Sequence, residues 1–229
     1  MQSITRHLLV QQMDCCDHPV LFCQIQYPQF SFPDSKAVEK AINQYCRRHA
    51  KERQAYCQSH LFPQACQEYQ AARSSGRTFL PYEFQVEYVV TYHQNCLISL
   101  YTDQYTFTGD AHGSTKRISC TWDLCTGRKL PLRHFFPYFS SPSSSAIPPA
   151  DTFLLSCLQN WLEQEIRERR KKDPSLYFED FPQLLRSTFQ EDQFFLEPEG
   201  IVFYFQPYDI GPHSTGLPTF LLPFFQRAA

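Results

Sequence analysis

The sequence has no excess of positive charge, and this limits its partners. Its 21 Lys and Arg residues and 23 Asp and Glu residues give a formal net charge of -2 and a pI near 6.4. A protein that holds nucleic acid without sequence specificity presents a broad basic surface to the phosphates. This composition provides no such surface, so we expect no nucleic-acid partner.

Long apolar runs are also missing. No stretch is long enough to span a bilayer, and the first twelve residues lack the basic start and the apolar core of a secretory signal. We therefore expect a cytoplasmic protein without a membrane span. A leader sequence ahead of residue 1 would instead place the protein outside the cytoplasm.

Sequence motifs of two common kinds of site are absent. The chain has no Cys-x-x-Cys or paired-histidine motif, and Cys120 and Cys125 are separated by four residues. A zinc site would therefore have to be assembled from distant parts of the chain. A Gly-x-Ser-x-Gly nucleophile elbow is missing as well. We expect no metal, no cofactor and no catalytic residue that can be named from the sequence.

The ten cysteines leave two interpretations open. An even number of cysteines in a small secreted chain often indicates disulfides. This chain is long enough to bury a core without them, and its cysteine spacings are irregular, which favours reduced and mostly buried thiols. Four cysteines with apolar or strand-like neighbours are predicted to pack as small hydrophobic residues: Cys23, Cys96, Cys120 and Cys157.

Aromatic residues are abundant, with 21 Phe and 13 Tyr in 229 residues. This content predicts a folded protein with a phenylalanine-rich core. A chain of this length can form one large domain or two small ones.

The N-terminal part is predicted to begin with strands and continue with a helix. Strands at residues 4–10 and 19–27 flank a polar turn at residues 14–17. A helix is predicted from the Ser35 region to about Cys57. Its packed face is expected from residues at three- and four-residue steps: Ala37, Ala41, Ile42 and Tyr45.

A second helical piece is predicted at residues 64–73, beyond Pro63, with an end at Gly76. The apolar period then changes to two, which indicates a strand whose inward residues are Tyr82, Phe84, Val86, Tyr88, Val90 and Tyr92. Further strands are predicted at 96–102 and 117–124, the latter with four inward residues: Ile118, Cys120, Trp122 and Leu124.

The C-terminal part is predicted to contain two helices and three strands. One helix begins near Asp151, and its apolar residues are Leu154, Leu155, Leu158, Trp161, Leu162 and Ile166. A shorter helix lies within residues 178–189. Residues 194–196 and 201–205 are predicted to pair as a hairpin, with a last strand at 219–222.

Residues 131–150 mark a seam between these two parts, because the serines and prolines of residues 140–149 suit neither helix nor sheet. The sequence therefore predicts an α+β protein built from two helix-on-antiparallel-sheet units. The first covers residues 1–130, in the order β-β-α-β-β-β, and the second covers residues 131–229.

Two loops are candidates for ligand binding. The first, residues 108–113, holds Gly109, Asp110, His112 and Gly113. Its glycines let the backbone approach a ligand closely, while its acid and imidazole provide charge and proton chemistry. The alternative is a tight connection between strands, in which Asp110 bonds its own backbone.

The second loop, residues 206–216, combines Pro207, Tyr208, Asp209 and His213 with a second proline and two glycines. Such a loop is rigid and polar at its tip, so it loses little conformational entropy when it binds a partner. The alternative is a connection locked only for packing.

A basic run, Arg-Glu-Arg-Arg-Lys-Lys at residues 167–172, ends the predicted helix. Cations at this position complement the helix dipole, so a solvated helix end is the expected role. A patch for an anionic partner is the alternative.

Motifs spread over nearly the whole chain carry a family resemblance. They lie at residues 199–225, which begin Glu-Gly-Ile-Val-Phe-Tyr-Phe-Gln-Pro-Tyr-Asp, at residues 105–113 and at residues 121–130. Shorter matches lie at residues 26–30 and 41–45. Together these motifs resemble the RsiV-like family of bacterial domains. That family includes the sensor region of an anti-sigma factor, and related modules accompany cell-wall polysaccharide deacetylases.

The resemblance, the rigid loops and the lack of a complete catalytic signature favour an α+β module that binds a ligand over an enzyme. It suggests a protein partner of the c-type lysozyme kind, or a cell-wall-related ligand, recognised by the loops at residues 109–113 and 207–216. The family usually has Gly-Gly-Ala-His where this chain has Gly-Asp-Ala-His, at residues 109–112.

Two other functions stay open. Asp110, His112, Asp209 and His213 can meet in space as the acid–base groups of a hydrolase. The chain can also be a cytoplasmic regulatory partner, because it lacks the sigma-binding region and membrane span of a complete anti-sigma factor.

Overall fold

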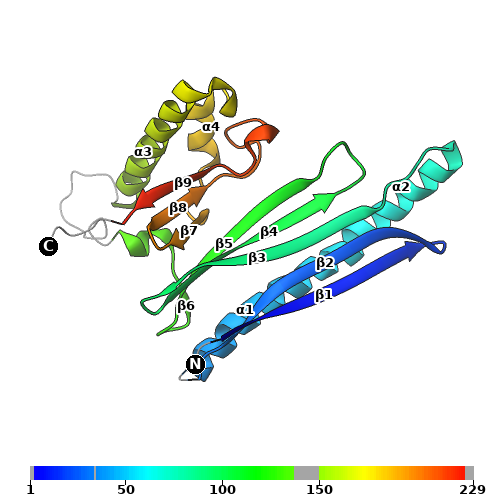
Figure 1. The fold of residues 1–229 in the computed structure, drawn as a ribbon, viewed down its shortest axis with the longest axis horizontal. Coiled ribbons are helices and arrows are strands. Elements are labelled where there is room, and N and C mark those ends of the chain that lie inside the picture. The colour runs from blue at the N-terminus through cyan, green and yellow to red at the C-terminus, as the bar shows by residue number, and fades with distance from the viewer. Residues whose placement is uncertain (1–2, 34, 137–149, 225–229) are drawn as a thin grey trace. The chain divides into compact units, whose positions relative to one another are not determined.

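The computed structural model describes residues 3–33, 35–136 and 150–224, and it has an α+β fold (Figure 1). These residues form one sheet of six strands, one sheet of three strands and the helices that accompany them. The predicted fold class is therefore confirmed. The serines and prolines of the predicted seam, within residues 137–149, lie outside the described residues.

The chain forms two compact units that alternate along the sequence. The first unit holds Met1–Val89, Thr102–Arg117 and Leu124–Gly127. The second unit holds the remaining segments: Val90–Tyr101, Ile118–Asp123 and Arg128–Ala229. The predicted boundary near residue 130 stays a prediction.

The first unit opens with an antiparallel hairpin of β1 (Ser3–Cys15) and β2 (His18–Ser31). Cys16 and Asp17 form its turn with φ angles of 52° and 63°. Positive φ at both central residues is the geometry that matches the twist of a two-residue hairpin. Both strands run further than predicted, because backbone pairing continues through polar residues that carry no apolar signal.

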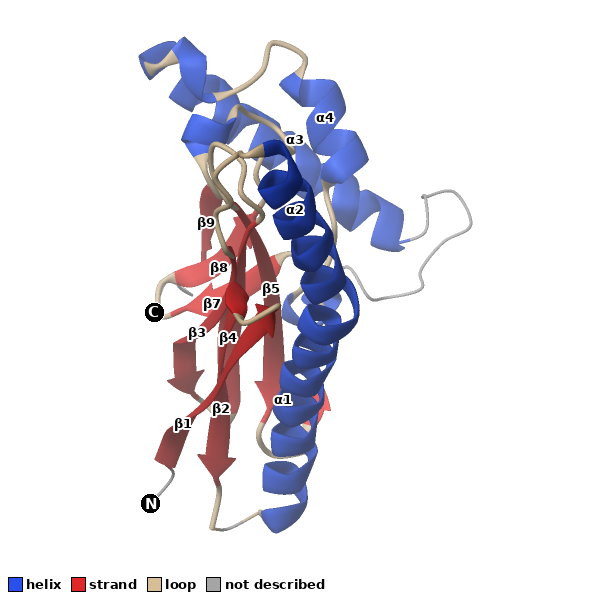
Figure 2. Cartoon of the chain, turned by 90° about the vertical axis from the view of Figure 1, so that its right-hand side faces the viewer, coloured by secondary structure: helices blue, strands red, loops and turns tan. Residues whose placement is uncertain are grey.

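The hairpin is followed by one nearly continuous helical segment (Figure 2). It consists of α1 (Lys36–Tyr56), a π-helical turn η1 (Cys57–Leu61) and α2 (Phe62–Ser75). Pro63 does not separate two helices as predicted, because it lies in the first turn of α2, where its missing N–H is tolerated. Gly76 ends the segment with a φ of 68°, as predicted.

The packed face of α1 differs from the predicted one. Its buried residues recur every four positions: Val38, Ile42, Cys46 and Ala50. Ala37, which we expected on this face, is exposed. Val38 and Cys46 have larger side chains than Ala37 and Ala41, so they bury more apolar area. The packed face is therefore rotated by about one residue from the predicted one.

The six-stranded sheet has the order β1-β2-β3-β4-β5-β6. Its later strands are β3 (Tyr82–Gln94), β4 (Leu97–Phe107), β5 (Ser114–Asp123) and β6 (Arg128–Lys129). β2 and β3 pair in parallel, with Leu21 opposite Tyr82 and Ile25 opposite Val86. A parallel pair needs a long crossover, and the helical segment provides it.

The core of the first unit lies between the helical segment and β1 to β3. The predicted alternation of β3 is confirmed here, because Tyr82, Phe84 and Val86 are buried while Glu87 is exposed. They pack with Leu21 and Ile25 of β2 and with four helical residues: Ala50, Cys57, Leu61 and Ala65.

In the second unit, the last part of β5 is buried on both faces. Ser119, Cys120, Thr121 and Trp122 are all buried, whereas Ile118 is 38% exposed. The predicted inward alternation is therefore wrong at Ile118. A strand covered on both faces has no polar face, so alternation cannot indicate which residues are buried.

The second unit also packs α3 (Ala150–Lys172) and α4 (Phe181–Thr188) against a small antiparallel sheet. That sheet has the order β7-β8-β9, with β7 (Phe194–Glu197), β8 (Gly200–Tyr204) and β9 (Thr219–Pro223). The predicted elements of this region are confirmed. The core joins leucines of α3 to aromatic residues: Phe181, Phe194, Phe203, Phe205 and Phe220.

The cysteine prediction is only partly correct. Cys23 and Cys120 are buried, but Cys96 and Cys157 are exposed. Cys96 occupies a hairpin turn with a φ of 59°, and Cys157 lies beside the buried Leu158 on the outer side of α3. Within the described residues, no helix is long and apolar enough to cross a membrane.

Candidate functional site

The loop at residues 206–216 leaves β8 and returns to β9, and its first turn is closed by an aspartate. The Gln206 backbone N–H donates to Asp209 Oδ2 at 2.8 Å, and the Asp209 N–H donates to the Gln206 carbonyl at 3.1 Å. Partial burial raises the pKa of Asp209, while the bond from the Gln206 N–H opposes that rise. Tyr208 is held between them with a φ of 70°.

The rest of the loop is bonded to the segment that joins α3 to α4. The Phe178 N–H donates to the Ile210 carbonyl at 3.1 Å, and the Thr215 hydroxyl donates to the Leu176 carbonyl. A Cβ atom on Gly211 would overlap that same Leu176 carbonyl oxygen, so only glycine permits this approach. The loop is therefore fixed at both ends and in the middle.

The tip of this fixed loop carries two exposed rings. Tyr208 is 54% exposed, and its ring centroid lies 5.7 Å from that of His213 with the planes tilted by 42°. His213 and Ser214 are exposed beside it. The loop thus presents an exposed aromatic ring and an exposed imidazole on a rigid frame.

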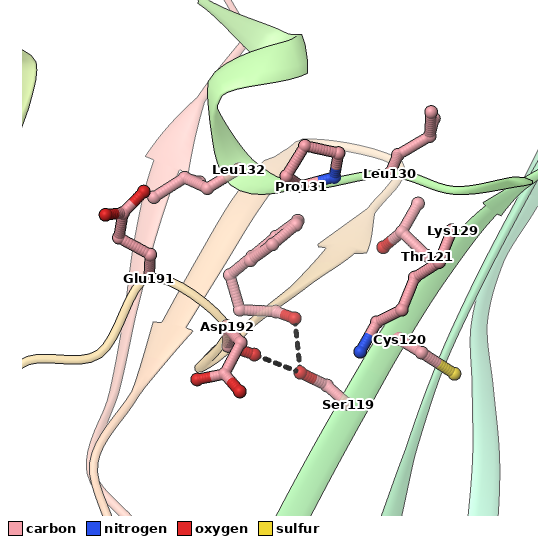
Figure 3. Close-up of a pocket in the computed structure, with 10 residues that line it drawn as sticks. Ser119, Cys120, Thr121, Lys129, Leu130, Pro131, Leu132, Glu191 and Asp192 are labelled. Carbon is pink, nitrogen blue, oxygen red and sulfur yellow. Dashed lines mark hydrogen bonds between the residues drawn. The ribbon is translucent and has the colours of Figure 1, made fainter. Parts of the chain in front are cut away.

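A pocket of about 250 Å³ lies in the same unit (Figure 3). Its wall comes from β5 at Ser119–Thr121, from the segment Lys129–Leu132, and from the turn before β7 and the first residue of that strand: Glu191, Asp192 and Phe194. Leu130, Pro131, Leu132 and Phe194 make most of the wall apolar, while Lys129, Glu191 and Asp192 are exposed. The pocket suits a small apolar group with a polar substituent.

Buried hydroxyls hold the strands around this pocket. Ser119 Oγ lies 2.5 Å from the Phe194 carbonyl and 3.1 Å from the Asp192 carbonyl (Figure 3). The Tyr204 hydroxyl, at 3.2 Å, can donate to Ser119 in turn. Nearby, the Leu196 N–H donates to Ser99 Oγ at 2.9 Å, and Ser99 shares a hydrogen bond with the Thr121 hydroxyl.

Replacing Ser119 with alanine is expected to lower the free energy of unfolding of the second unit by about 1–3 kcal/mol, because the buried Phe194 carbonyl loses its side-chain donor. Both tryptophans of the chain, Trp122 and Trp161, belong to this unit, so urea unfolding followed by tryptophan fluorescence reports it. Ser114→Ala, an exposed position on the same strand, should change little. Equal effects of the two substitutions would contradict the network.

The other candidate loop, residues 108–113, belongs to the first unit and joins β4 to β5. The Thr108 hydroxyl donates to Asp110 Oδ2 at 3.1 Å, and Gly109 has a φ of 85°. A Cβ atom on Gly113 would overlap the Tyr105 ring. Both glycines and the acid therefore have local roles in the connection. Asp110 and His112 are exposed, and the ligand-binding role of this loop stays a prediction.

The four residues proposed for acid–base chemistry are divided between the units. Asp110 and His112 belong to the first unit, and Asp209 and His213 belong to the second. Their joint action stays a prediction. Across residues 3–33, 35–136 and 150–224, no three His, Cys, Asp or Glu side chains gather as they would around a metal ion.

Arginines of the basic run at residues 167–172 contact aromatic rings within the second unit. Arg169 lies over the Phe220 ring at 4.2 Å, and Arg167 and Arg170 both lie over Phe181 at 5.5 Å. Such cation–π contacts stabilise both partners when they are partly buried. The run is therefore more than the solvated helix end that we expected.

Sequence reasoning did not find the pocket. Its residues come from three segments, and Ser119 and Glu191 are 72 positions apart by their numbers. Ser119 and Thr121 alternate with Cys120 and Trp122, as polar residues do on the solvent-exposed face of a strand. The sequence therefore offers no signal that Ser119 and Thr121 are buried.

Two regions of the chain match known family models. Residues 15–115 match the model described as Deacetylase PdaC, and residues 154–224 match the model described as a protein of unknown function, DUF3298. The second match includes the whole 206–216 loop. Among curated proteins, none matches the chain.

Solved structures share the fold. A DUF3298 family member from Bacteroides fragilis is 17% identical with a TM-score of 0.64, and the match covers 97% of this chain and 90% of that one. A DUF3298 family protein from Pseudomonas aeruginosa is 16% identical with a TM-score of 0.57, covering 97% and 91%. The chain thus joins a region similar to the PdaC model to a region similar to the DUF3298 model, on a fold that solved DUF3298 proteins share.

Proposed function

We propose that this chain is a binding module, and not an enzyme, that recognises a protein partner through the 206–216 loop. The observation that carries the proposal is the combination of a fixed backbone with an exposed pair of rings, Tyr208 and His213. Tyrosine is a frequent anchor of protein interfaces, because it supplies a large contact area with few rotatable bonds.

The rigidity of the loop favours binding. A mobile loop must lose conformational entropy when a partner immobilises it, whereas this loop is already held by Asp209, Ile210 and Thr215. More of the contact energy is then retained as affinity. The rigidity is a property of the free protein and is independent of the identity of the partner.

The pocket supports the same proposal. β7 and β8 are antiparallel, with Phe194 opposite Phe203, and the Tyr204 N–H donates to the Gln193 carbonyl. The start of β7 and the end of β8 therefore lie at the same end of the sheet. The turn that lines the pocket and the 206–216 loop both emerge from that end, so one partner can engage both.

The partner that we propose is a protein of the c-type lysozyme kind, with a cell-wall-related ligand as the other member of this hypothesis. The support is the RsiV-like resemblance of residues 199–225, which overlaps the match to the DUF3298 model. A calorimetric titration of the protein with a c-type lysozyme tests the proposal. Saturable binding is the expected result, and no binding at micromolar concentrations would remove lysozyme as the partner.

A hydrolase-like activity is the second candidate, and the match of residues 15–115 to a model described as a deacetylase favours it. Under our proposal, the wild type turns over acetylated polysaccharide only at the background rate. The double variant His112→Ala with His213→Ala then shows the same rate. Circular dichroism checks that the double variant folds. A turnover that is present in the wild type and lost in the folded double variant would establish catalysis. If neither activity nor lysozyme binding is found, affinity capture tests a cytoplasmic regulatory role.

A further inference from the structure

Two buried thiols face each other in the core of the first unit. Cys23 on β2 is 3% exposed, and Cys57, the first residue of the π-helical turn η1, is fully buried. The Cys23 thiol donates to Cys57 Sγ across 3.1 Å. This separation is about 1 Å longer than the S–S bond of ~2.05 Å, so a small movement can join the two sulfurs.

The two thiols are not equivalent. When Cys23 is ionised, Cys57 can donate to the Cys23 thiolate, and this hydrogen bond lowers the pKa of Cys23, with burial acting in the opposite direction. The same bond raises the pKa of Cys57, and burial raises it further. Cys23 is therefore the better candidate for the thiolate that attacks an oxidant first, and Cys57 is the thiol that attacks in the second step.

The backbone around Cys57 is unusual in a way that suits a reactive position. A π-helical turn is rare and occurs frequently at functional sites. Here it interrupts the helical segment at the level of the Cys23 contact. A local opening at this turn would expose Cys57 and the Cys23 thiol in contact with it, without unfolding the remainder of α1 and α2.

A second thiol contact lies between the same hairpin and the same helical segment, nearer to the solvent. Burial and a hydrogen bond with Cys15 of β1 raise the pKa of Cys66 on α2 to about 11. Cys66 is half-buried, and Cys16 beside Cys15 is exposed. Thiols of the hairpin thus contact thiols of the helical segment at two places, Cys23 with Cys57 and Cys15 with Cys66.

We propose that Cys23 and Cys57 form a reversible dithiol site that closes to a disulfide by exchange with a small-molecule disulfide. The Cys23 thiolate attacks the oxidant and releases one thiol, which leaves a mixed disulfide. Cys57 then attacks the Cys23 sulfur, forms the new S–S bond and releases the second thiol. Two electrons and two protons pass from the protein to the oxidant, and the bond joins β2 to η1.

The test uses the full chain, incubated with excess oxidised glutathione or with a reductant. Each sample is quenched in acid, alkylated after unfolding and digested without reduction for mass spectrometry. The expected result is a Cys23–Cys57 cross-linked peptide, two hydrogens lighter than its parts, only in the oxidised sample. Because the bond closes a loop between positions 34 residues apart, thermal unfolding should shift upward by about 5–15 °C.

A matched pair of variants separates the cross-link from general packing. Cys57→Ala should abolish both the peptide and the upward shift, whereas Cys46→Ala, at another buried cysteine of the same helical segment, should keep them. The peptide map of the wild type decides the question even if Cys57→Ala fails to fold. Recovery of Cys23 and Cys57 as separate alkylated peptides, with glutathione only on exposed cysteines, would overturn the proposal, and so would a cross-link without a thermal shift.

Discussion

Alanine at Gly200 is expected to lower the free energy of unfolding of the second unit by about 3 kcal/mol. Gly200 lies opposite Pro223 in the β8–β9 ladder. A Cβ atom on Gly200 would overlap the Leu222 carbonyl oxygen and would lie 2.8 Å from the Pro223 Cα atom. These neighbours are backbone atoms, so no side-chain rotation can relieve the overlap, and β9 has to move away.

The measurement is urea unfolding followed by tryptophan fluorescence and circular dichroism. Gly76→Ala, in the first unit and therefore followed by circular dichroism, is the control. Its Cβ atom would have nothing within 4 Å, and its positive φ alone should cost about 1 kcal/mol. A loss for Gly200→Ala no larger than that of the control would contradict the close packing of β8 and β9.

Alanine at both Tyr208 and His213 is expected to weaken lysozyme binding by roughly 30- to 100-fold, which corresponds to the loss of about 2–3 kcal/mol at an interface anchor. The reason is that these two rings are exposed on the fixed 206–216 loop. Their removal leaves the hydrogen bonds that hold the loop untouched. The loss should therefore appear in affinity and not in stability.

The chain offers a matched control for this prediction. Tyr56 and His60 of the first unit also form an exposed ring pair, with centroids 5.2 Å apart. Tyr56→Ala with His60→Ala removes the same chemical groups at a place that our proposal does not use. Equal weakening of binding by the two double variants would place the recognition surface elsewhere.

Much of the fold could be predicted from local patterns. The alternation from Tyr82 to Tyr92 indicated β3, and the apolar steps from Leu154 to Ile166 indicated α3. The parallel pairing of β2 with β3 could not be predicted in this way. Strand pairing depends on where the intervening helices return the chain, and no residue pattern within either strand records it.

The candidate site was predictable in part. The prolines and glycines of residues 206–216 indicated a rigid loop, and the bonds of Asp209 and Thr215 account for that rigidity. One of those bonds joins Thr215 to Leu176, which lies 39 positions earlier. The sequence does not indicate that these two residues lie close together. The contact of Cys23 with Cys57 was missed for the same reason. A turn of π-helix has no recognisable residue pattern, and it determines which helical cysteine meets Cys23.

Glycine is required at different positions of this chain for different physical reasons. Gly76 and Gly109 have positive φ angles, whereas Gly200 and Gly211 are required because another backbone lies against them. A sequence alone does not separate these two reasons. The distinction matters for the site, because Gly211 is the point where the 206–216 loop meets Leu176.

Amide hydrogen exchange of the 206–216 loop, measured with and without a c-type lysozyme, tests the central claim most directly. We expect slow exchange at Gln206, Asp209 and Thr215 in the free protein, because their N–H groups are bonded within the loop. We also expect added protection around Tyr208 and His213 when lysozyme is bound. Fast exchange throughout the loop of the free protein, or no change at saturating lysozyme, would contradict a pre-organised recognition surface.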